Sequence, residues 1–377
     1  MKKGETADMP RRLTRSVIDS LDPYIPGRPI EDVEREYGLT DVIKMASNEN
    51  PWGSSPMALE AMREELGRSN LYPEGSCRDL REALAGRLGV TPEMIVVSNG
   101  ADNVLMMIAQ AFVEKGEEVV MARPTFAIYR TAVLLMGGVP VEVPLRDFTH
   151  DLRGMAQAVG PRTKAVIVCN PNNPTGTMVG KRDLDSFLDR LPDHTLLILD
   201  EVYGDFAASP DYPDGLDLIS GERPVISVRS FSKLYGLAGL RVGYAVSSPG
   251  LAEALNRVRE PFPVNRLAQV AAKAALLDEG FRRHVLAETE KGKAFLGRAL
   301  RDMGLRCLES STNFLFVDLM RDAQGVFQEL LRRGIIVRPG KIWGAPTWCR
   351  ITIGTMEQNR RLVRALAEVL AEEGGED

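Results

Sequence analysis

The chain has 377 residues, enough for two domains, with 44% hydrophobic and 26% charged residues, an ordinary balance for a globular protein. The formal net charge of -5 at pH 7 gives no reason to expect a nucleic-acid partner, because such proteins carry clustered basic faces. No stretch approaches the roughly 18 uncharged apolar residues of a membrane span, and the N-terminus lacks the pattern of a signal peptide. We therefore expect a cytoplasmic protein that binds neither membranes nor nucleic acids.

The cysteines and histidines are too few and too scattered for a metal centre. They are Cys77, Cys169, Cys307, Cys349, His150, His194 and His284. No two of them have the spacing of metal ligands, and nothing in their distribution suggests a disulfide framework. We expect reduced thiols and no metal, so the chemistry must come from other side chains.

From about residue 90 to 247, short apolar runs alternate with helical patterns such as Asp102–Val113 and Leu184–Leu191. Several runs are continuous rather than alternating, which is typical of strands buried on both faces. This arrangement predicts an α/β domain with a mostly parallel sheet. The seven predicted strands are Met94–Val97, Glu118–Met121, Val139–Val143, Ala165–Val168, Leu196–Leu199, Val225–Val228 and Val242–Val246.

The pattern changes after about residue 250, where helices dominate and only a few strands follow. This change predicts a smaller α+β domain. The expected elements are a helix-rich stretch Leu251–Met303 broken around Pro261–Pro263, strands at Phe314–Val317, Ile335–Val337 and Cys349–Ile353, and helices at Ala323–Arg333 and from Glu357 onward. We divide the chain into residues 1–45 (an arm and part of the small domain), 46–270 (the large domain) and 271–377 (the small domain).

Polar residues follow four of the predicted strands, at the edge where open parallel sheets bind ligands. The first is the segment Ser98–Asp102, which leads from a strand through Gly100 into a helix. Free backbone N–H groups and the positive dipole end of such a helix can bind a phosphate. An ordinary capped turn has the same pattern, and no Walker or dinucleotide glycine motif is present. This segment alone therefore does not distinguish a phosphate site from a plain turn.

The second segment is Cys169–Gly176, whose sequence is CNPNNPTG. Its two prolines stop the preceding strand and fix the loop. Its three asparagines exceed what a simple turn needs. A side-chain amide held at the end of a strand could donate a hydrogen bond to an oxygen on a ring.

The third segment is Asp200–Tyr203, at the end of a very apolar strand. A carboxylate in this position is costly unless it meets a cation or a hydrogen-bond donor. Asp200 opposite a pyridine nitrogen would keep that nitrogen protonated, and a helical turn would put Tyr203 on the same side. The alternative is that Asp200 only caps the turn.

The fourth segment, Arg229–Arg241, contains Lys233 directly after a buried strand. Lysine forms Schiff bases and needs a lowered pKa to attack a carbonyl. Burial and the nearby Arg241 would both lower that pKa. Ser230, Ser232 and Arg241 could together hold a dianionic phosphate. Small hydroxyls and a glycine- and alanine-rich stretch around a lysine are not typical of a solvated surface charge.

Together the four segments resemble the fold-type I pyridoxal-phosphate (PLP) enzymes, specifically the class I and II aminotransferases. The resemblance covers nearly the whole chain, from Tyr24 to the last helix, and the combination of NPNNPTG, DEVY and SFSKLYGLAGLR is highly specific. It implies PLP as the cofactor, a large domain with a mostly parallel seven-stranded sheet, and a smaller α+β domain.

The resemblance also implies a role for each matching residue. Lys233 would form the Schiff base and move the proton, Asp200 would pair with the pyridine nitrogen, and Tyr203 would complete the catalytic set. Asn173 and Tyr203 would bond the phenolic oxygen of the ring, and Phe126 would stack on the ring. The residues around the phosphate would be Ala101, Asp102, Ser230, Ser232 and Arg241.

Further segments resemble the histidinol-phosphate aminotransferase branch of this family: Pro23–Pro29, Ser47–Pro51, Tyr72–Glu74 and Arg350–Thr355. The branch implies that L-histidinol phosphate donates its amine to 2-oxoglutarate, giving imidazole-acetol phosphate and glutamate in histidine biosynthesis. Arg350 would clamp the substrate α-carboxylate. The residues expected at the substrate tail are Tyr24, Asn48 and Arg338.

Two alternatives stay open. Trp52 and Trp343 stand where this branch often differs, and an additional tryptophan near the entrance would also suit an aromatic amino acid aminotransferase. Packing under the small domain is the simpler explanation of both. A PLP lyase or decarboxylase would share the same cofactor site, so the sequence does not separate it from an aminotransferase.

The same branch implies a homodimer with shared active sites, in which Tyr72 reaches the phosphate of the neighbouring subunit's cofactor. The segment Tyr24–Pro29, with two prolines and a glycine, is typical of an extended arm. Such an arm has little reason to stay ordered unless it lies on another surface. The alternative is a monomer with a mobile arm and a surface Tyr72.

Overall fold

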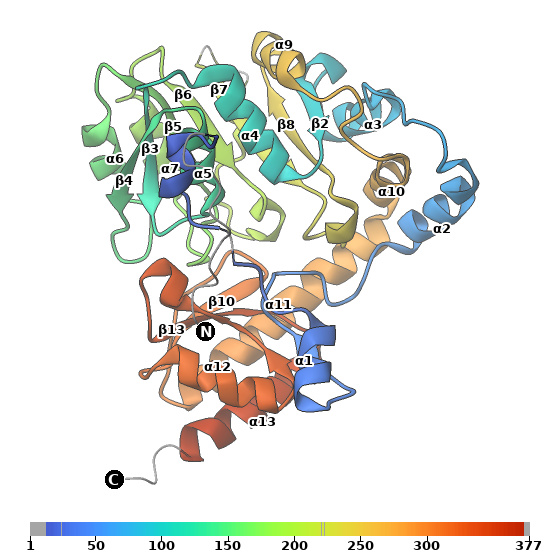
Figure 1. The fold of residues 1–377 in the computed structure, drawn as a ribbon, viewed down its shortest axis with the longest axis vertical. Coiled ribbons are helices and arrows are strands. Elements are labelled where there is room, and N and C mark those ends of the chain that lie inside the picture. The colour runs from blue at the N-terminus through green and yellow to red at the C-terminus, as the bar shows by residue number, and fades with distance from the viewer. Residues whose placement is uncertain (1–12, 24, 220, 222, 373–377) are drawn as a thin grey trace.

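The computed structural model describes residues 13–372, apart from residues 24, 220 and 222. A large unit surrounds the central sheet, and a smaller one holds the C-terminal elements together with α1 (Figure 1). The helices are α1 (Ile30–Tyr37), α2 (Pro56–Glu65), α3 (Arg78–Leu88), α4 (Ala101–Phe112), α5 (Ile128–Leu135), α6 (Leu152–Ala158), α7 (Lys181–Leu188), α8 (Gly215–Ile219), α9 (Pro249–Val258), α10 (Arg266–Leu277), α11 (Glu279–Asp302), α12 (Ala323–Arg332) and α13 (Met356–Glu372).

The central sheet has seven strands in the order β2-β8-β7-β6-β5-β3-β4. The strands are β2 (Ile95–Ser98), β3 (Glu118–Arg123), β4 (Val139–Pro144), β5 (Thr163–Cys169), β6 (Leu196–Asp200), β7 (Val225–Ser230) and β8 (Gly243–Ser247). β8 runs antiparallel to both of its neighbours, and the other pairings are parallel. The prediction of a mostly parallel seven-stranded sheet is confirmed.

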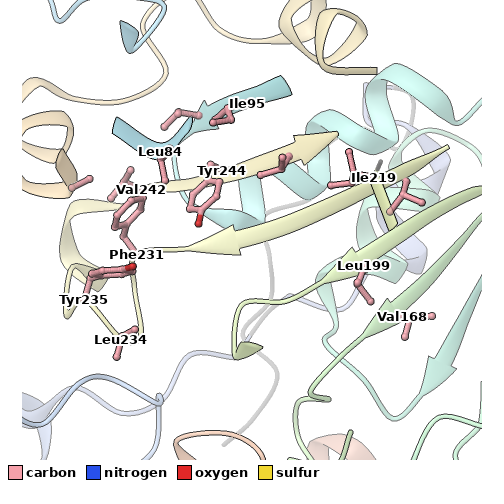
Figure 2. Close-up of a cluster of buried hydrophobic side chains, with 14 of the residues drawn as sticks. Leu84, Ile95, Val168, Leu199, Ile219, Phe231, Leu234, Tyr235, Val242 and Tyr244 are labelled. Carbon is pink, nitrogen blue, oxygen red and sulfur yellow. The ribbon is translucent and has the colours of Figure 1, made fainter. Parts of the chain in front are cut away.

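Helices cover both faces of this sheet, so successive residues of one strand enter different cores. Leu197 and Leu199 of β6 pack in the cluster that contains α3 and α10, shown in part in Figure 2, whereas Ile198 packs in the cluster that contains α4 and α5. Asp200 therefore continues the α4–α5 face, and Glu201 continues the α3–α10 face. The two residues serve opposite sides of the sheet.

The smaller unit is built from the two ends of the described chain. β1 (Ile43–Lys44) pairs in parallel with β11 (Ile335–Ile336). The other four described strands of this unit form an antiparallel sheet in the order β12-β13-β10-β9. Its strands are β9 (Arg306–Cys307), β10 (Phe314–Asp318), β12 (Arg338–Pro339) and β13 (Trp348–Thr352). The predicted α+β character is confirmed, while the boundaries at residues 45 and 270 stay a prediction.

The helix-rich stretch predicted from Leu251 to Met303 consists of three helices. The break expected around Pro261–Pro263 separates α9 from α10. A second boundary, which we did not predict, lies at Asp278, whose carboxylate caps α11 by accepting from the Phe281 N–H at 3.0 Å. The long helix α11 then runs from the large unit into the small one (Figure 1). Within the described part of the chain, every helix is too short or too polar to cross a lipid bilayer.

Candidate active site

A cavity of about 380 Å³ lies at the carboxyl ends of the parallel strands, where open α/β sheets bind ligands. Its walls come from the segments after β2, β5, β6 and β7 and from the small unit. Thirteen of the predicted site residues line it: Asn48, Ala101, Asp102, Phe126, Asn173, Asp200, Tyr203, Ser230, Ser232, Lys233, Arg241, Arg338 and Arg350. The structure thus brings together four segments that are far apart in the sequence.

One end of the cavity is a cradle at the N-terminus of α4. Gly100 precedes the helix with φ +84°, and a Cβ at this position would lie 2.6 Å from the Arg241 guanidinium. Gly243 of β8 also lacks room for a Cβ, which would lie 2.5 Å from the Ala101 nitrogen. The two glycines let the helix N-terminus, the Arg241 guanidinium and the Ser232 hydroxyl approach one another. This set of donors suits a phosphate dianion.

Lys233 lines the cavity. Its Nζ donates to the Ser47 carbonyl at 3.2 Å and lies 5.8 Å from the centre of the Tyr203 ring. Burial and then the Arg350 guanidinium lower the Lys233 pKa to about 8, against the opposing charge of Glu49. The lowered pKa agrees with the expectation, but Arg350 contributes more to it than Arg241 does.

Asp200 is 3% exposed, and each of its carboxylate oxygens accepts one hydrogen bond. Tyr129 donates to Oδ2 at 2.6 Å, and the Val202 N–H donates to Oδ1 at 3.0 Å. Burial raises the Asp200 pKa to about 6, although both hydrogen bonds act in the opposite direction. Among the residues that the structure describes, Asp200 has two hydrogen-bond donors and forms no ion pair. A buried carboxylate of this kind is suited to a ligand that brings a positive charge.

A hydrogen-bonded chain connects the two units on the far side of the cavity. Asn48 donates to the Tyr203 hydroxyl at 2.8 Å. Arg350 donates to the Asn173 side-chain oxygen at 2.6 Å and to the Ala46 carbonyl at 2.6 Å. Because Arg350 occupies the amide oxygen of Asn173, the amide N–H is the group left to meet a ring oxygen.

Among the predicted residues that the structure describes, Tyr72 does not line this cavity. Tyr72 is 77% exposed and stacks on Phe262 with ring centres 4.5 Å apart. Tyr24 lies outside the described residues, but the arm beyond it reaches the site. The Ile25 carbonyl accepts a hydrogen bond from Arg338, and Gly27 lines the cavity.

The two tryptophans contact other parts of the molecule. Trp52 packs against the core of the large unit and meets the His284 ring edge-on at 6.1 Å. Trp343 lies with its ring 5.1 Å from the Arg350 guanidinium carbon, in the range of a cation–π contact. Neither tryptophan lines the cavity, so Trp343 acts on the site only through Arg350.

The main residue that the sequence reasoning missed is Tyr129. It is 1% exposed, and its ring meets that of Phe126 edge-on at 5.8 Å. The two residues are three apart on a segment that becomes helical, and this spacing puts side chains on one face. This spacing could have indicated that Tyr129 lies on the same side of the segment as Phe126. Ser47, Glu49 and Cys169 also line the cavity without having been predicted.

The model of the family described as aminotransferase class I and II matches residues 40–366. The chain belongs to this family. It is similar to the histidinol-phosphate aminotransferase of Moorella thermoacetica, with 50% identity over 358 residues, which cover 95% of this chain and 93% of that protein. The histidinol-phosphate aminotransferase 2 of Carboxydothermus hydrogenoformans is 45% identical over 95% of this chain and 99% of its own length.

Solved structures of aminotransferases have the same fold. The crystal structure of histidinol-phosphate aminotransferase from Sinorhizobium meliloti in complex with pyridoxal-5'-phosphate superimposes with a TM-score of 0.89 at 33% identity, over 96% of this chain and 98% of that one. Aspartate aminotransferase from Thermus thermophilus with maleate gives 0.81 at 25% identity, over 94% and 99% of the two chains.

PLP is the cofactor of this aminotransferase family, and the residues present fit it. The cradle at Gly100 offers donors for its phosphate, the buried Asp200 carboxylate lines the cavity, and the Lys233 amine has a lowered pKa. These three groups match the phosphate, the ring nitrogen and the aldehyde of the cofactor. The enzyme is therefore a PLP-dependent aminotransferase.

Proposed function

We propose that this aminotransferase transfers the amine of L-histidinol phosphate to 2-oxoglutarate, giving imidazole-acetol phosphate and glutamate. The observation that carries the proposal is the placement of Arg338 and Arg350. They face each other as register partners on the antiparallel strands β12 and β13, and both line the cavity. Directly opposed residues of paired strands lie on the same face of a sheet, so two guanidiniums meet one substrate.

The charges of the substrates fit two guanidiniums. 2-Oxoglutarate and glutamate each carry two carboxylates, and L-histidinol phosphate carries a dianionic phosphate in place of an α-carboxylate. A planar guanidinium binds either group bidentately. Arg350 is 7% exposed and donates to Asn173 and to the Ala46 carbonyl. The assignment also rests on the similarity to the two histidinol-phosphate aminotransferases above, which covers nearly the full length of each.

When bound, PLP withdraws electrons from the substrate carbon that loses its proton. Lys233 supplies the amine that holds the cofactor, and its lowered pKa lets that amine be neutral and accept a proton near neutral pH. Asp200 would hold a positive charge at the ring nitrogen. Phe126 would stack on the ring, while Tyr203 and Asn173 would offer donors to its oxygen.

The active enzyme in this proposal is a homodimer with shared sites. Tyr72 is highly exposed, stacks on the half-exposed Phe262 and does not line the cavity of its own chain. An aromatic ring and a hydroxyl in such a position suit an interface. A two-fold arrangement would put both Tyr72 side chains into sites of the opposite subunits.

Mixing two inactive variants tests the shared site. A dimer of one Lys233→Ala chain and one Tyr72→Ala chain contains one site with both defects and one with neither. Activity that returns after subunit exchange supports the proposal. No recovery despite proven exchange would mean that Tyr72 serves its own chain.

The reaction class is tested by product analysis. The enzyme is incubated with a panel of amines and 2-oxoglutarate, and the products are read by mass spectrometry. Equal amounts of glutamate and of the ketone from L-histidinol phosphate are expected. Release of carbon dioxide or ammonia in place of glutamate would instead identify a decarboxylase or a lyase.

A further inference from the structure

A second cavity, of about 890 Å³, lies on the opposite face of the central sheet from the cofactor site. The alternation of strand residues separates the two. Asp200 and Ser230 line the first cavity, whereas their chain neighbours Glu201 and Arg229 line the second. The remaining walls come from α3, from the residues after β6, from Tyr235 after β7 and Tyr244 of β8, and from the junction of α10 and α11. Its size is in the range of small-molecule sites.

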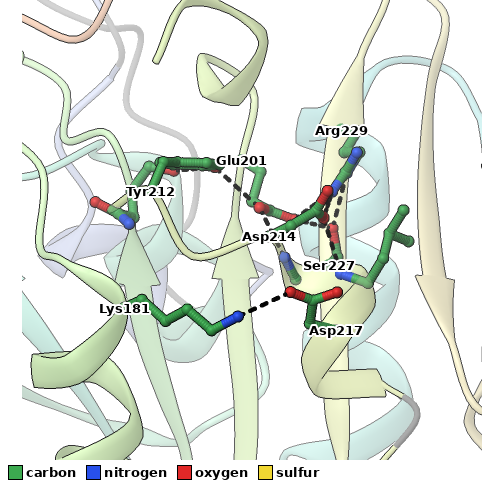
Figure 3. Close-up of polar contacts among 10 residues, drawn as sticks. Lys181, Glu201, Tyr212, Asp214, Asp217, Ser227 and Arg229 are labelled. Carbon is green, nitrogen blue, oxygen red and sulfur yellow. Dashed lines mark hydrogen bonds and ion pairs between the residues drawn. The ribbon is translucent and has the colours of Figure 1, made fainter. Parts of the chain in front are cut away.

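The wall nearest to the sheet is a rigid ion-pair network (Figure 3). The Glu201 side chain is 1% exposed and accepts from the Tyr212 hydroxyl at 2.9 Å, the Gly215 N–H at 3.0 Å and Arg229 at 3.0 Å. Arg229 also pairs with Asp214 at 2.5 Å. Because these groups form hydrogen bonds and ion pairs with one another, they shape the cavity wall. Contacts to a ligand are therefore expected from other residues.

Three polar groups that line the cavity have capacity left for a ligand. Asp205 is exposed, and its carboxylate makes no hydrogen bond or ion pair to any residue that the structure describes. The Tyr244 side chain is 6% exposed, and its hydroxyl has no partner within the described residues either. Arg282 pairs with Glu279 at 3.5 Å, but its buried Nε lacks a hydrogen-bond partner. Groups of this kind stay unsatisfied unless water or a ligand meets them.

Groups of both charge signs line this cavity close to one another. Glu201 and Asp214 both pair with Arg229, and Arg87 and Arg282 both pair with Glu279, at 2.5 Å and 3.5 Å. The guanidiniums of Arg229, Arg282 and Arg87 act to lower the pKa of the Asp205 carboxyl. A ligand that carries both a positive and a negative charge can therefore meet a partner for each.

The surroundings of Asp205 favour a ligand cation. Asp205 is exposed and lines the cavity, so its carboxylate can contact a ligand cation directly. An ammonium group can do so, since it also finds a hydrogen-bond acceptor in the Tyr244 hydroxyl.

We propose that this second cavity binds a free α-amino acid. Its ammonium group lies on Asp205 and Tyr244, and its carboxylate lies on Arg282 and Arg87. The apolar side chains of Leu88, Leu276 and Leu277 also line the cavity, so the amino acid that fits carries an apolar or aromatic side chain. The site is independent of the cofactor and of the substrate proposed above.

The experiment uses holoenzyme whose cofactor has been fixed to Lys233 with borohydride, so that transamination cannot occur. Isothermal titration calorimetry then measures binding of L-phenylalanine, L-tryptophan, L-leucine and L-methionine. The proposal expects at least one of them to bind saturably. Asp205→Asn, an isosteric change at a solvent-accessible side chain, should weaken that binding by roughly tenfold or more, as expected for the loss of one charged hydrogen bond. Tyr244→Phe should weaken it less.

Two controls separate this site from the cofactor cavity. Arg350→Gln removes an active-site guanidinium, and binding at the second cavity should survive it unchanged. The matching deaminated acid, 3-phenylpropionate for L-phenylalanine, should bind the unmodified chain no better than it binds Asp205→Asn. Absence of binding by all four amino acids would overturn the proposal. Binding that is lost in Arg350→Gln and kept in a folded Asp205→Asn protein would overturn it as well, because the amino acid would then occupy the active site.

Discussion

Tyr129 donates a hydrogen bond to Asp200 at 2.6 Å from the same segment that presents Phe126 to the cavity. One short stretch of chain therefore supplies Phe126, which would contact the cofactor ring, and Tyr129, which holds the Asp200 carboxylate that would face the ring nitrogen. Burial keeps the pKa of the Tyr129 phenol well above its ordinary value, so the hydroxyl stays a donor at any pH at which the enzyme works.

Tyr129→Phe removes this donor without changing the shape of the core. Because the hydrogen bond lowers the Asp200 pKa, its loss should raise that pKa and leave more of the carboxyl protonated near neutral pH. A hydrogen bond to a charged group contributes roughly 1.5–3 kcal/mol, so PLP should bind the apoenzyme about tenfold or more weakly.

The measurement is the PLP dissociation constant of the apoenzyme as a function of pH, followed by absorbance. In the unmodified enzyme, affinity should fall as the pH drops through about 6, where Asp200 takes up a proton. In Tyr129→Phe the fall should begin at higher pH. An unchanged pH profile would show that Tyr129 does not lower the Asp200 pKa.

Asp200→Asn should keep the fold and lower turnover by several orders of magnitude, in line with preorganised electrostatic interactions in active sites. The amide is nearly isosteric but cannot stabilise a positive charge on the ring nitrogen. Thermal unfolding controls for the fold, and single-turnover kinetics measure the rate. Near-normal turnover would mean that Asp200 serves only as an acceptor for Tyr129 and the Val202 N–H.

Lys233 gives a second pH dependence. A pKa of about 8 leaves roughly one amine in ten neutral at pH 7, against about one in three thousand at the ordinary lysine pKa. The rate at which apoenzyme captures PLP covalently should therefore rise with pH and level off above about 8. Because the Arg350 charge lowers this pKa, Arg350→Gln should move the midpoint to higher pH, and a midpoint that stays in place would refute the coupling.

Gly100→Ala should damage the phosphate cradle. The added Cβ would lie 2.6 Å from the Arg241 guanidinium, and the backbone has φ +84°, a conformation that costs an L-residue roughly 1–2 kcal/mol. PLP affinity should fall by about tenfold or more. Gly239→Ala, where a Cβ meets no atom within 4 Å, is the matched control in the wall of the same cavity. Equal PLP affinities in the two variants would contradict the claim that the segment at Gly100 binds the phosphate.

Much of this fold follows from the sequence because buried parallel strands are continuous apolar runs. All seven runs became strands, and the polar residues after four of them line one cavity. The Tyr129–Asp200 contact was harder to predict, because a tyrosine in an apolar helical pattern is indistinguishable from an ordinary core residue. The boundary at Asp278 was missed for a similar reason, since a single capping aspartate interrupts an otherwise helical stretch.

The second cavity could not be predicted at all. Its lining residues come from α3, α11 and three strand ends that carry no shared motif. Only the register of β6, β7 and β8 puts Glu201, Arg229 and Tyr244 on one face. Alternation within each strand was visible in the sequence, but the order of the strands in the sheet was not.

The substrate assignment is tested most directly by comparing kcat/KM for L-histidinol phosphate with the values for L-phenylalanine and L-tyrosine, each with 2-oxoglutarate, in the unmodified enzyme and in Arg338→Gln. L-Histidinol phosphate should be preferred by roughly tenfold or more, a transition-state difference of at least about 1.4 kcal/mol, and Arg338→Gln should remove most of this preference. A preference of the same size for either aromatic amino acid in the unmodified enzyme would contradict the account and identify an aromatic aminotransferase.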